Sequence, residues 1–168
     1  SKSIKEALIN RDENFILDLI NRQKHMEYID LNVGPAKREL EGILPWLCEL
    51  VEKNSDLKIS FDTRNTGEMR HGLQSCQKHS EAFINSTSAD DDRLDVLVKM
   101  AKEFDSNLIA LTMNRDLGIP KTADERLNLA LEIYDECTDF EVKIVRIFYD
   151  PLILPISVDL SQAVDPLI

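Results

Sequence analysis

The sequence is short of cysteine and of positive charge, and it has no long apolar run. Its three cysteines, Cys48, Cys76 and Cys137, are odd in number and far apart, which predicts free thiols and argues against a disulfide framework. With 20 basic against 31 acidic residues the net charge is −11, which opposes nucleic acid or an anionic membrane as the main partner. No stretch approaches the roughly 20 apolar residues of a membrane helix, and the first residues contain no signal-peptide apolar region. We therefore expect a soluble, cytoplasmic protein that binds neither nucleic acid nor a membrane.

Nucleotide-binding loops are also missing. Val33-Gly34-Pro35 is not a dinucleotide fingerprint, and no GxxxxGK[ST] sequence occurs. Their absence argues against nucleotide hydrolysis and nicotinamide chemistry. A length of 168 residues suits one domain with a sizeable core and leaves little room for two.

Apolar stretches of strand length alternate with amphipathic segments of helix length. We expect helices at 4–9, 14–24, 39–53, 66–77, 91–104 and 122–137, and strands at 28–32, 57–61, 82–85, 107–112 and 145–149. Asp12 and Thr122 are expected N-caps, and Pro45 must either kink the third helix or mark a late start. The alternation predicts an α/β fold with parallel strands and right-handed crossovers.

Each expected strand ends in polar residues. The endings are Asp30-Leu31-Asn32, Ser60-Phe61-Asp62, Asn85-Ser86-Thr87, Thr112-Met113-Asn114 and Tyr149-Asp150. Polar ends on nearly every strand favour a (β/α) TIM barrel over a doubly wound sheet, which concentrates such residues at one switch point. A complete barrel has eight units and about 250 residues. Since about five units are visible, we expect an incomplete barrel, with ligands bound at the carboxyl ends of its strands.

These endings, taken in order, resemble the pterin-binding methyltransferases. The segments are Asp30-Leu31-Asn32-Val33-Gly34-Pro35, Phe61-Asp62-Thr63-Arg64-Asn65, Ile84-Asn85-Ser86-Thr87-Ser88, Leu111-Thr112-Met113-Asn114 with Gly118-Ile119-Pro120-Lys121, and Tyr149-Asp150-Pro151-Leu152-Ile153-Leu154-Pro155. The likeness runs from about Ile4 to Asp159 and is strongest to the methyltetrahydrofolate:corrinoid/iron–sulfur protein methyltransferases. Their TIM barrel is shared with dihydropteroate synthase. The resemblance implies a pterin-binding domain over residues 1–168 that lacks the first and the last two strands of the barrel.

The resemblance also implies a reaction and a set of site residues. The chain would bind methyltetrahydrofolate and transfer its N5 methyl group to the Co(I) corrinoid, a cobalamin-type cofactor, of a partner protein. Asp62, Asn85 and Asp150 would hold the pterin, and Asp30 with Asn32 would join the same hydrogen-bond network. Asp30, Asn85 and Asp150 would be the catalytic residues, since the leaving amine at N5 must be protonated. A homodimer is expected from the family alone.

Two departures from the family pattern leave alternatives open. Arg64 stands where the family commonly has a small hydroxyl residue, and the strand that supplies an asparagine to N5 has no counterpart in this sequence. We therefore expect either part of a longer protein or a truncated homologue. A non-catalytic pterin-binding or assembly module and a dihydropteroate synthase remain as alternative functions.

No metal site is expected. His71, Cys76 and His79 lie in and just after a helix, without a fourth partner at the spacing of structural zinc sites. Asp90-Asp91-Asp92 is typical of a solvated cluster at a helix N-terminus.

Overall fold

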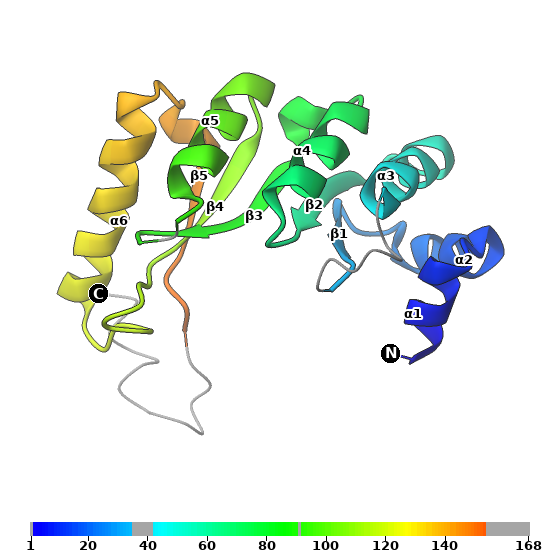
Figure 1. Cartoon of the computed structure of the whole chain (residues 1–168), viewed down its shortest axis with the longest axis horizontal. Coiled ribbons are helices and arrows are strands. Elements are labelled where there is room, and N and C mark those ends of the chain that lie inside the picture. Colours follow the sequence, from blue (N-terminus) through cyan, green and yellow to red (C-terminus); the bar gives the residue numbers. More distant parts are fainter. Residues whose placement is uncertain (1, 35–41, 91, 154–168) are drawn as a thin grey trace. The chain divides into compact units, whose positions relative to one another are not determined.

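Strands and helices alternate along the chain in the order that the sequence predicts (Figure 1). The computed structural model describes residues 2–34, 42–90 and 92–153. Strand order follows chain order, β1-β2-β3-β4-β5, and each described pairing is parallel. This order lacks the reversal of a doubly wound sheet. The predicted α/β class and the five parallel strands of an incomplete TIM-type barrel are therefore confirmed.

The chain divides into two compact units. The first comprises Ser1–Asn85 with Phe104–Ser106, and the second Ser86–Glu103 with Asn107–Ile168. The division falls within β3 (Phe83–Ser88) and before the last residue of α5 (Leu94–Phe104). Both elements therefore contribute residues to both units.

The first unit holds the two N-terminal helices, the first two strands and the start of the third. Its elements are α1 (Lys2–Ile9), α2 (Glu13–Gln23), β1 (Tyr28–Asn32), α3 (Ile43–Asn54), β2 (Lys58–Asp62), α4 (Thr66–Ser75), the short helix η2 (His79–Glu81) and the start of β3. Asp12 caps α2 as predicted, because its carboxylate accepts a hydrogen bond of 3.1 Å from the backbone N–H of Phe15.

Helix α3 explains the position of Pro45. The helix begins at Ile43, so the proline falls in the first turn, where backbone N–H groups have no intrahelical acceptor and a missing N–H costs little. The late start is thus confirmed. Gly42 precedes the helix at φ 69°, a conformation that glycine adopts without a Cβ penalty. Residues 39–41 of the expected helix lie outside the described residues.

The strands of the first unit have one apolar and one polar face. Their buried apolar residues are Ile29, Leu31, Ile59, Phe61 and Ile84, which alternate with polar residues as the strand period requires. The apolar face packs against helix α4, where a Cβ added to Gly72 would lie 2.7 Å from the Phe61 ring. Helix packing on one face leaves the other face for the polar residues.

The second unit contains the rest of β3, α5, β4 (Asn107–Leu111), α6 (Ala123–Asp139), the short helix η3 (Ile144–Arg146) and β5 (Ile147–Asp150). Thr122 caps α6 as predicted, and Glu125 completes a capping box with it. The core of the unit is built from apolar positions of α5, β4 and α6, among them Leu97, Leu108 and Ile133.

Three predicted boundaries are wrong in the second unit. Strand β3 runs to Ser88 rather than ending at 85, because the polar residues after Asn85 continue the strand. Strand β5 begins at 147 rather than 145, since Ile144–Arg146 form a turn of 3-10 helix. Helix α5 begins at 94 rather than 91. Asp90 and Asp92 precede it and bind the backbone N–H and the guanidinium of Arg115. Residue 91 and residues 154–168 lie outside the described residues.

No helix among the described residues is both long and apolar enough to cross a lipid bilayer.

Candidate functional site

Strand register gathers four of the predicted site residues on the polar face of the first unit. Asn32 on β1 lies opposite Asp62 on β2, and Asp62 lies opposite Asn85 on β3. Asp30 is two residues before Asn32, and so it points to the same side. These four residues form an acidic and amide cluster, Asp30, Asn32, Asp62 and Asn85, at the carboxyl ends of three neighbouring strands. The position is the one that the sequence predicts.

One oxygen of Asp30 joins all three strands. Its Oδ1 accepts a hydrogen bond of 2.6 Å from the Ser60 hydroxyl on β2 and one of 3.1 Å from the Asn85 amide on β3. Among the described residues, no donor lies on Oδ2 of Asp30. Since a carboxylate oxygen accepts without donating, this second oxygen is an acceptor that a ligand N–H can use.

Asn32 and Asp62 form the second pair of the cluster. The Asn32 amide nitrogen donates to Oδ2 of Asp62 at 2.5 Å. Its amide oxygen accepts from the backbone N–H of Gly34 at 2.9 Å, which fixes which end of the amide faces the aspartate. The Oδ1 atom of Asp62 has no donor among the described residues, so it too is available to a ligand.

Burial raises the pKa of Asp62 above its ordinary value of 3.8, and the negative charge of Asp30 adds to that rise. The hydrogen bond from Asn32 acts in the opposite direction, because it stabilises the carboxylate. Asp62 is thus a carboxylate whose charge is incompletely compensated by the protein. A ligand that brings N–H donors would supply the missing compensation.

Asp150 lies in the second unit, at the carboxyl end of β5. Its Oδ1 accepts a hydrogen bond of 2.8 Å from the backbone N–H of Leu152, a residue with φ 54°. Its backbone oxygen accepts from the N–H and the hydroxyl of Thr112 at 3.0 and 3.2 Å. The carboxylate therefore holds the turn after the strand. Its contact with a pterin stays a prediction.

Ser60 is a site residue that the sequence analysis did not single out. It is buried and lies opposite Asp30 in the β1–β2 register, where its hydroxyl orients the carboxylate. The signal was present in its spacing, because Ser60 is two residues before Asp62 and therefore on the same face of β2. A lone serine within an apolar strand gave no reason to choose it.

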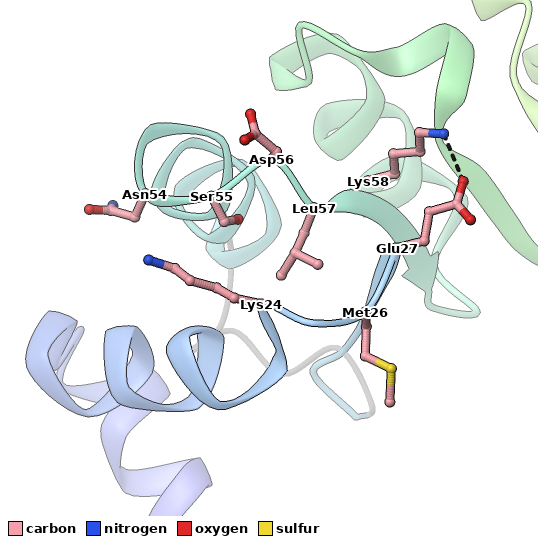
Figure 2. A pocket seen from close by; sticks show the side chains of 8 residues that line it. All are labelled: Lys24, Met26, Glu27, Asn54, Ser55, Asp56, Leu57 and Lys58. Atoms are coloured by element: carbon pink, nitrogen blue, oxygen red, sulfur yellow. Dashed lines mark hydrogen bonds and ion pairs between the residues drawn. The ribbon is translucent and has the colours of Figure 1, made fainter.

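A separate cavity of about 430 Å³ lies at the amino ends of β1 and β2 (Figure 2). It is lined by Lys24, Met26, Glu27, Asn54, Ser55, Asp56, Leu57 and Lys58. Its lining has two lysines and two acidic residues, so the charges cancel. Lys58 also pairs with Glu27 at 2.9 Å and, outside the lining, with Glu81 at 3.2 Å. Ligands of parallel α/β folds bind at the opposite, carboxyl ends of the strands. This cavity is therefore not the predicted site.

Comparisons with known proteins identify the family. The sequence profile of the family described as "Pterin binding enzyme" matches residues 26–164, a range that includes all five predicted site residues. A curated protein of Eubacterium limosum, "Methylcorrinoid:tetrahydrofolate methyltransferase", is 26% identical over 161 residues. The alignment covers 93% of this chain and 58% of that protein. The chain thus spans little more than half of the length of this relative.

Proposed function

The chain belongs to the family of pterin-binding enzymes, and from this membership we propose that it binds a reduced folate for methyl transfer. The methyl group would move between N5 of the folate and the cobalt of a corrinoid carried by a partner protein. The observation that carries the proposal is the pair of carboxylate oxygens, Oδ2 of Asp30 and Oδ1 of Asp62, that have no donor among the described residues. They lie in a cluster at the carboxyl ends of neighbouring strands.

The residue types of the cluster suit a pterin. The pterin ring has an edge of N–H donors beside a carbonyl, and a carboxylate can accept two such N–H groups in parallel. Asp62 would accept from this edge, while Asn85 would use the amide oxygen that its bond to Asp30 leaves available. Asp150 is added to this set by the family resemblance alone.

The residues would also control the proton at N5. When methyl leaves N5 for the corrinoid acceptor, the N5–carbon bond would break, a cobalt–carbon bond would form, and N5 would gain a proton delivered through the carboxylate and amide network. Asp30 and Asn85 would stabilise the protonated amine by hydrogen bonding and by the negative charge of Asp30. Asp150 joins them as a catalytic residue by the family resemblance alone. No covalent intermediate with the protein is needed.

The same bonds serve methyl transfer in either direction. The sequence resemblance implies transfer from methyltetrahydrofolate to Co(I) corrinoid, whereas the name of the Eubacterium limosum relative gives methylcorrinoid as the donor. These are the forward and reverse directions of one reaction. The same residues would protonate N5 when the methyl group leaves it and deprotonate N5 when the methyl group arrives. The name of this relative favours methyl transfer over the dihydropteroate synthase alternative.

The protein partner and the oligomeric state of the chain are also proposals. A corrinoid protein as partner rests on the resemblance and on the relative's name. Homodimerisation, cytoplasmic location and a single pterin-binding domain over residues 1–168 stay predictions.

The proposal is tested by two assays on the chain. The first measures binding of tetrahydrofolate and methyltetrahydrofolate by calorimetry, and the second follows methyl transfer to or from free cobalamin at the cobalt absorption bands. Binding with transfer supports the proposal. Binding without transfer favours the pterin-binding module, and no folate binding contradicts both.

A further inference from the structure

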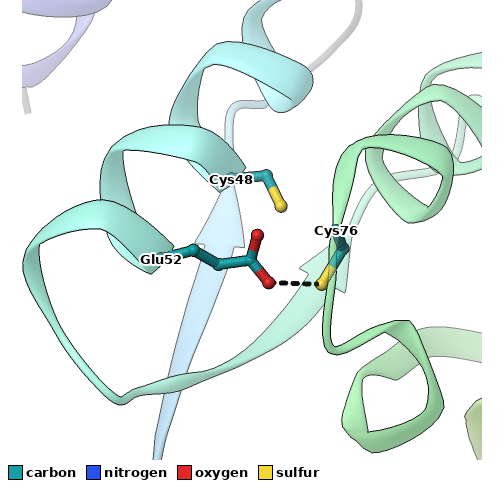
Figure 3. Close-up of side chains that lie close together, drawn as sticks. All are labelled: Cys48, Glu52 and Cys76. Atoms are coloured by element: carbon teal, nitrogen blue, oxygen red, sulfur yellow. Dashed lines mark hydrogen bonds between the residues drawn. The ribbon is translucent and has the colours of Figure 1, made fainter.

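Two cysteines and a glutamate from two neighbouring helices meet inside the first unit (Figure 3). Cys48 and Glu52 are one turn apart on α3, which places them on the same helix face, and Cys76 follows the last residue of α4. The two sulfur atoms and a carboxylate oxygen of Glu52 all lie within 4.8 Å of one another. Both cysteines are buried, Cys48 completely. The sequence analysis expected no metal site at His71, Cys76 and His79, and among the described residues neither histidine joins the group that Cys76 forms.

One spacing in the cluster, between Cys76 and Glu52, matches that of a tetrahedral metal site. With Zn–S of about 2.3 Å and Zn–O of about 2.1 Å, a tetrahedron sets sulfur and oxygen about 3.6 Å apart and two sulfurs about 3.8 Å apart. The Sγ of Cys76 and Oε1 of Glu52 are 3.4 Å apart, close to the first of these values. The third ligand atom, Sγ of Cys48, lies within 4.8 Å of the other two. A small side-chain rotation would bring it to the spacing of a tetrahedral site.

The backbone already orients two of the three ligands. The Glu52 carboxylate accepts backbone N–H groups from Gln77 and Lys78, each at 3.1 Å, and each oxygen keeps a lone pair for a metal. The N–H of Cys76 binds the carbonyl oxygens of Gly72 and Leu73, at 3.1 and 3.3 Å, as the cap of α4. Such outer hydrogen bonds are what hold ligands in preformed metal sites.

We propose that Cys48, Glu52 and Cys76 bind one Zn²⁺ ion, with the fourth position open to water. Two thiolates favour Zn²⁺ over Mg²⁺ or Ca²⁺. A carboxylate oxygen is a common further ligand of Zn²⁺. Binding displaces the protons of both thiols into solvent, so that two thiolates and one carboxylate meet the dipositive ion. The site would tie α3 to α4, the helix whose Gly72 contacts Phe61 of β2. The test of this site does not depend on folate binding, because it measures metal content and stability.

The test uses cobalt as a spectroscopic substitute for zinc. The chain is freed of metal with a chelator, kept reduced with a phosphine, and titrated with Co²⁺. We expect saturation at one ion per chain, a near-ultraviolet band of thiolate-to-cobalt charge transfer, release of the cobalt by an equivalent of Zn²⁺, and a higher melting temperature with zinc. Cys48→Ser and Cys76→Ser should each lose the band, and Glu52→Gln should weaken Co²⁺ binding at least tenfold.

Cys137→Ser is the matched control, because Cys137 is also a free, fully buried thiol but lies on α6 in the second unit. It should keep the band unchanged. Circular dichroism verifies that each variant is folded, and Cys48→Ala replaces any serine variant that is not. The absence of a charge-transfer band in the wild-type chain would overturn the proposal, as would an unchanged band in folded Cys48→Ser or Cys48→Ala.

Discussion

Asn85 on β3 donates a hydrogen bond to Asp30 on β1, 3.1 Å from Nδ2 to Oδ1, although β2 lies between the two strands. The contact spans the intervening strand because both side chains lie on the polar face, where Ser60 of β2 binds the same oxygen. It fixes the Asn85 amide with its oxygen available to a ligand. A single amide thus both orients a carboxylate and completes the acceptor set.

Replacing Asp62 by asparagine should weaken folate binding without unfolding the chain. Asp62→Asn keeps the shape and can still accept from Asn32, but it exchanges a charged acceptor for a neutral one that also carries N–H groups. We expect the dissociation constant of methyltetrahydrofolate to rise about 10- to 100-fold, equivalent to about 1–3 kcal/mol. Isothermal calorimetry measures the change.

The control for this variant is Asp56→Asn. Asp56 is an exposed aspartate just before β2, at the opposite end of the strand from Asp62, and it lines the separate cavity. Its replacement removes the same charge and should leave folate affinity unchanged. Equal affinity of the Asp62 variant and the wild type would remove Asp62 from the site.

Folate affinity should fall in acid through the titration of Asp62. The ionised carboxylate is the form that accepts N–H groups, and burial with the nearby Asp30 charge raises its pKa above 3.8. Affinity should therefore decline as pH falls through a value higher than that of a free aspartate. Calorimetry across a pH series should show this decline in the wild type and a flatter dependence in Asp62→Asn. An identical pH dependence in both would contradict the assignment.

Gly72→Ala should destabilise the first unit. A Cβ at this position would lie 2.7 Å from Cε1 of Phe61, so the fully buried ring must shift in a filled core. We expect a loss of about 1–3 kcal/mol in unfolding free energy, against the gain of up to about 1 kcal/mol that alanine brings to an unhindered helix position.

A double-mutant cycle identifies the cause of that loss. In a Phe61→Leu background the clash is removed, so Gly72→Ala should cost less there than in the wild type, as urea unfolding would show. Equal costs in both backgrounds would mean that the ring is not responsible.

Thr122→Ala should destabilise α6 by about 1 kcal/mol, because it removes the hydroxyl that accepts from the N–H of Glu125 at 3.2 Å. Thr138→Ala, an exposed threonine in the last turn of the same helix, is the control and should cost less. Thermal unfolding of the two variants compares the losses.

The same capping box gives a pH dependence. Backbone N–H groups of Lys121 and Thr122 lower the pKa of Glu125 below its ordinary 4.5. A carboxylate whose pKa is lower in the folded state stabilises the fold above its unfolded-state pKa, and this stabilisation disappears as pH falls through the folded-state value. Glu125→Gln should therefore flatten the acid limb of the thermal stability curve. A limb identical to that of the wild type would contradict the capping role.

The sequence predicted the fold because periodicity and strand endings are local signals. Asp12 and Thr122 carry cap chemistry within three residues, and Pro45 is tolerated only near a helix start. The predicted strand stops at 85, whereas β3 includes Ser86 and Thr87, because polar residues are a weak local signal of a strand.

The site was predictable only in part. Asp30, Asn32, Asp62 and Asn85 could be grouped, because the carboxyl ends of parallel strands meet at one edge. The contacts within the group could not, since they depend on the register between β1, β2 and β3. The proximity of Cys48 and Cys76 could not be predicted from the sequence, because it depends on how α3 packs against α4.

The most direct test is a calorimetric titration of methyltetrahydrofolate into the wild-type chain and into Asn85→Ala. We predict one site per chain in the wild type and a dissociation constant about 10- to 100-fold higher in the variant, since Asn85→Ala removes an acceptor and releases Asp30. Asp150→Ala should show a loss of the same order. Absence of folate binding to the wild type, or an unchanged affinity in Asn85→Ala, would contradict the account.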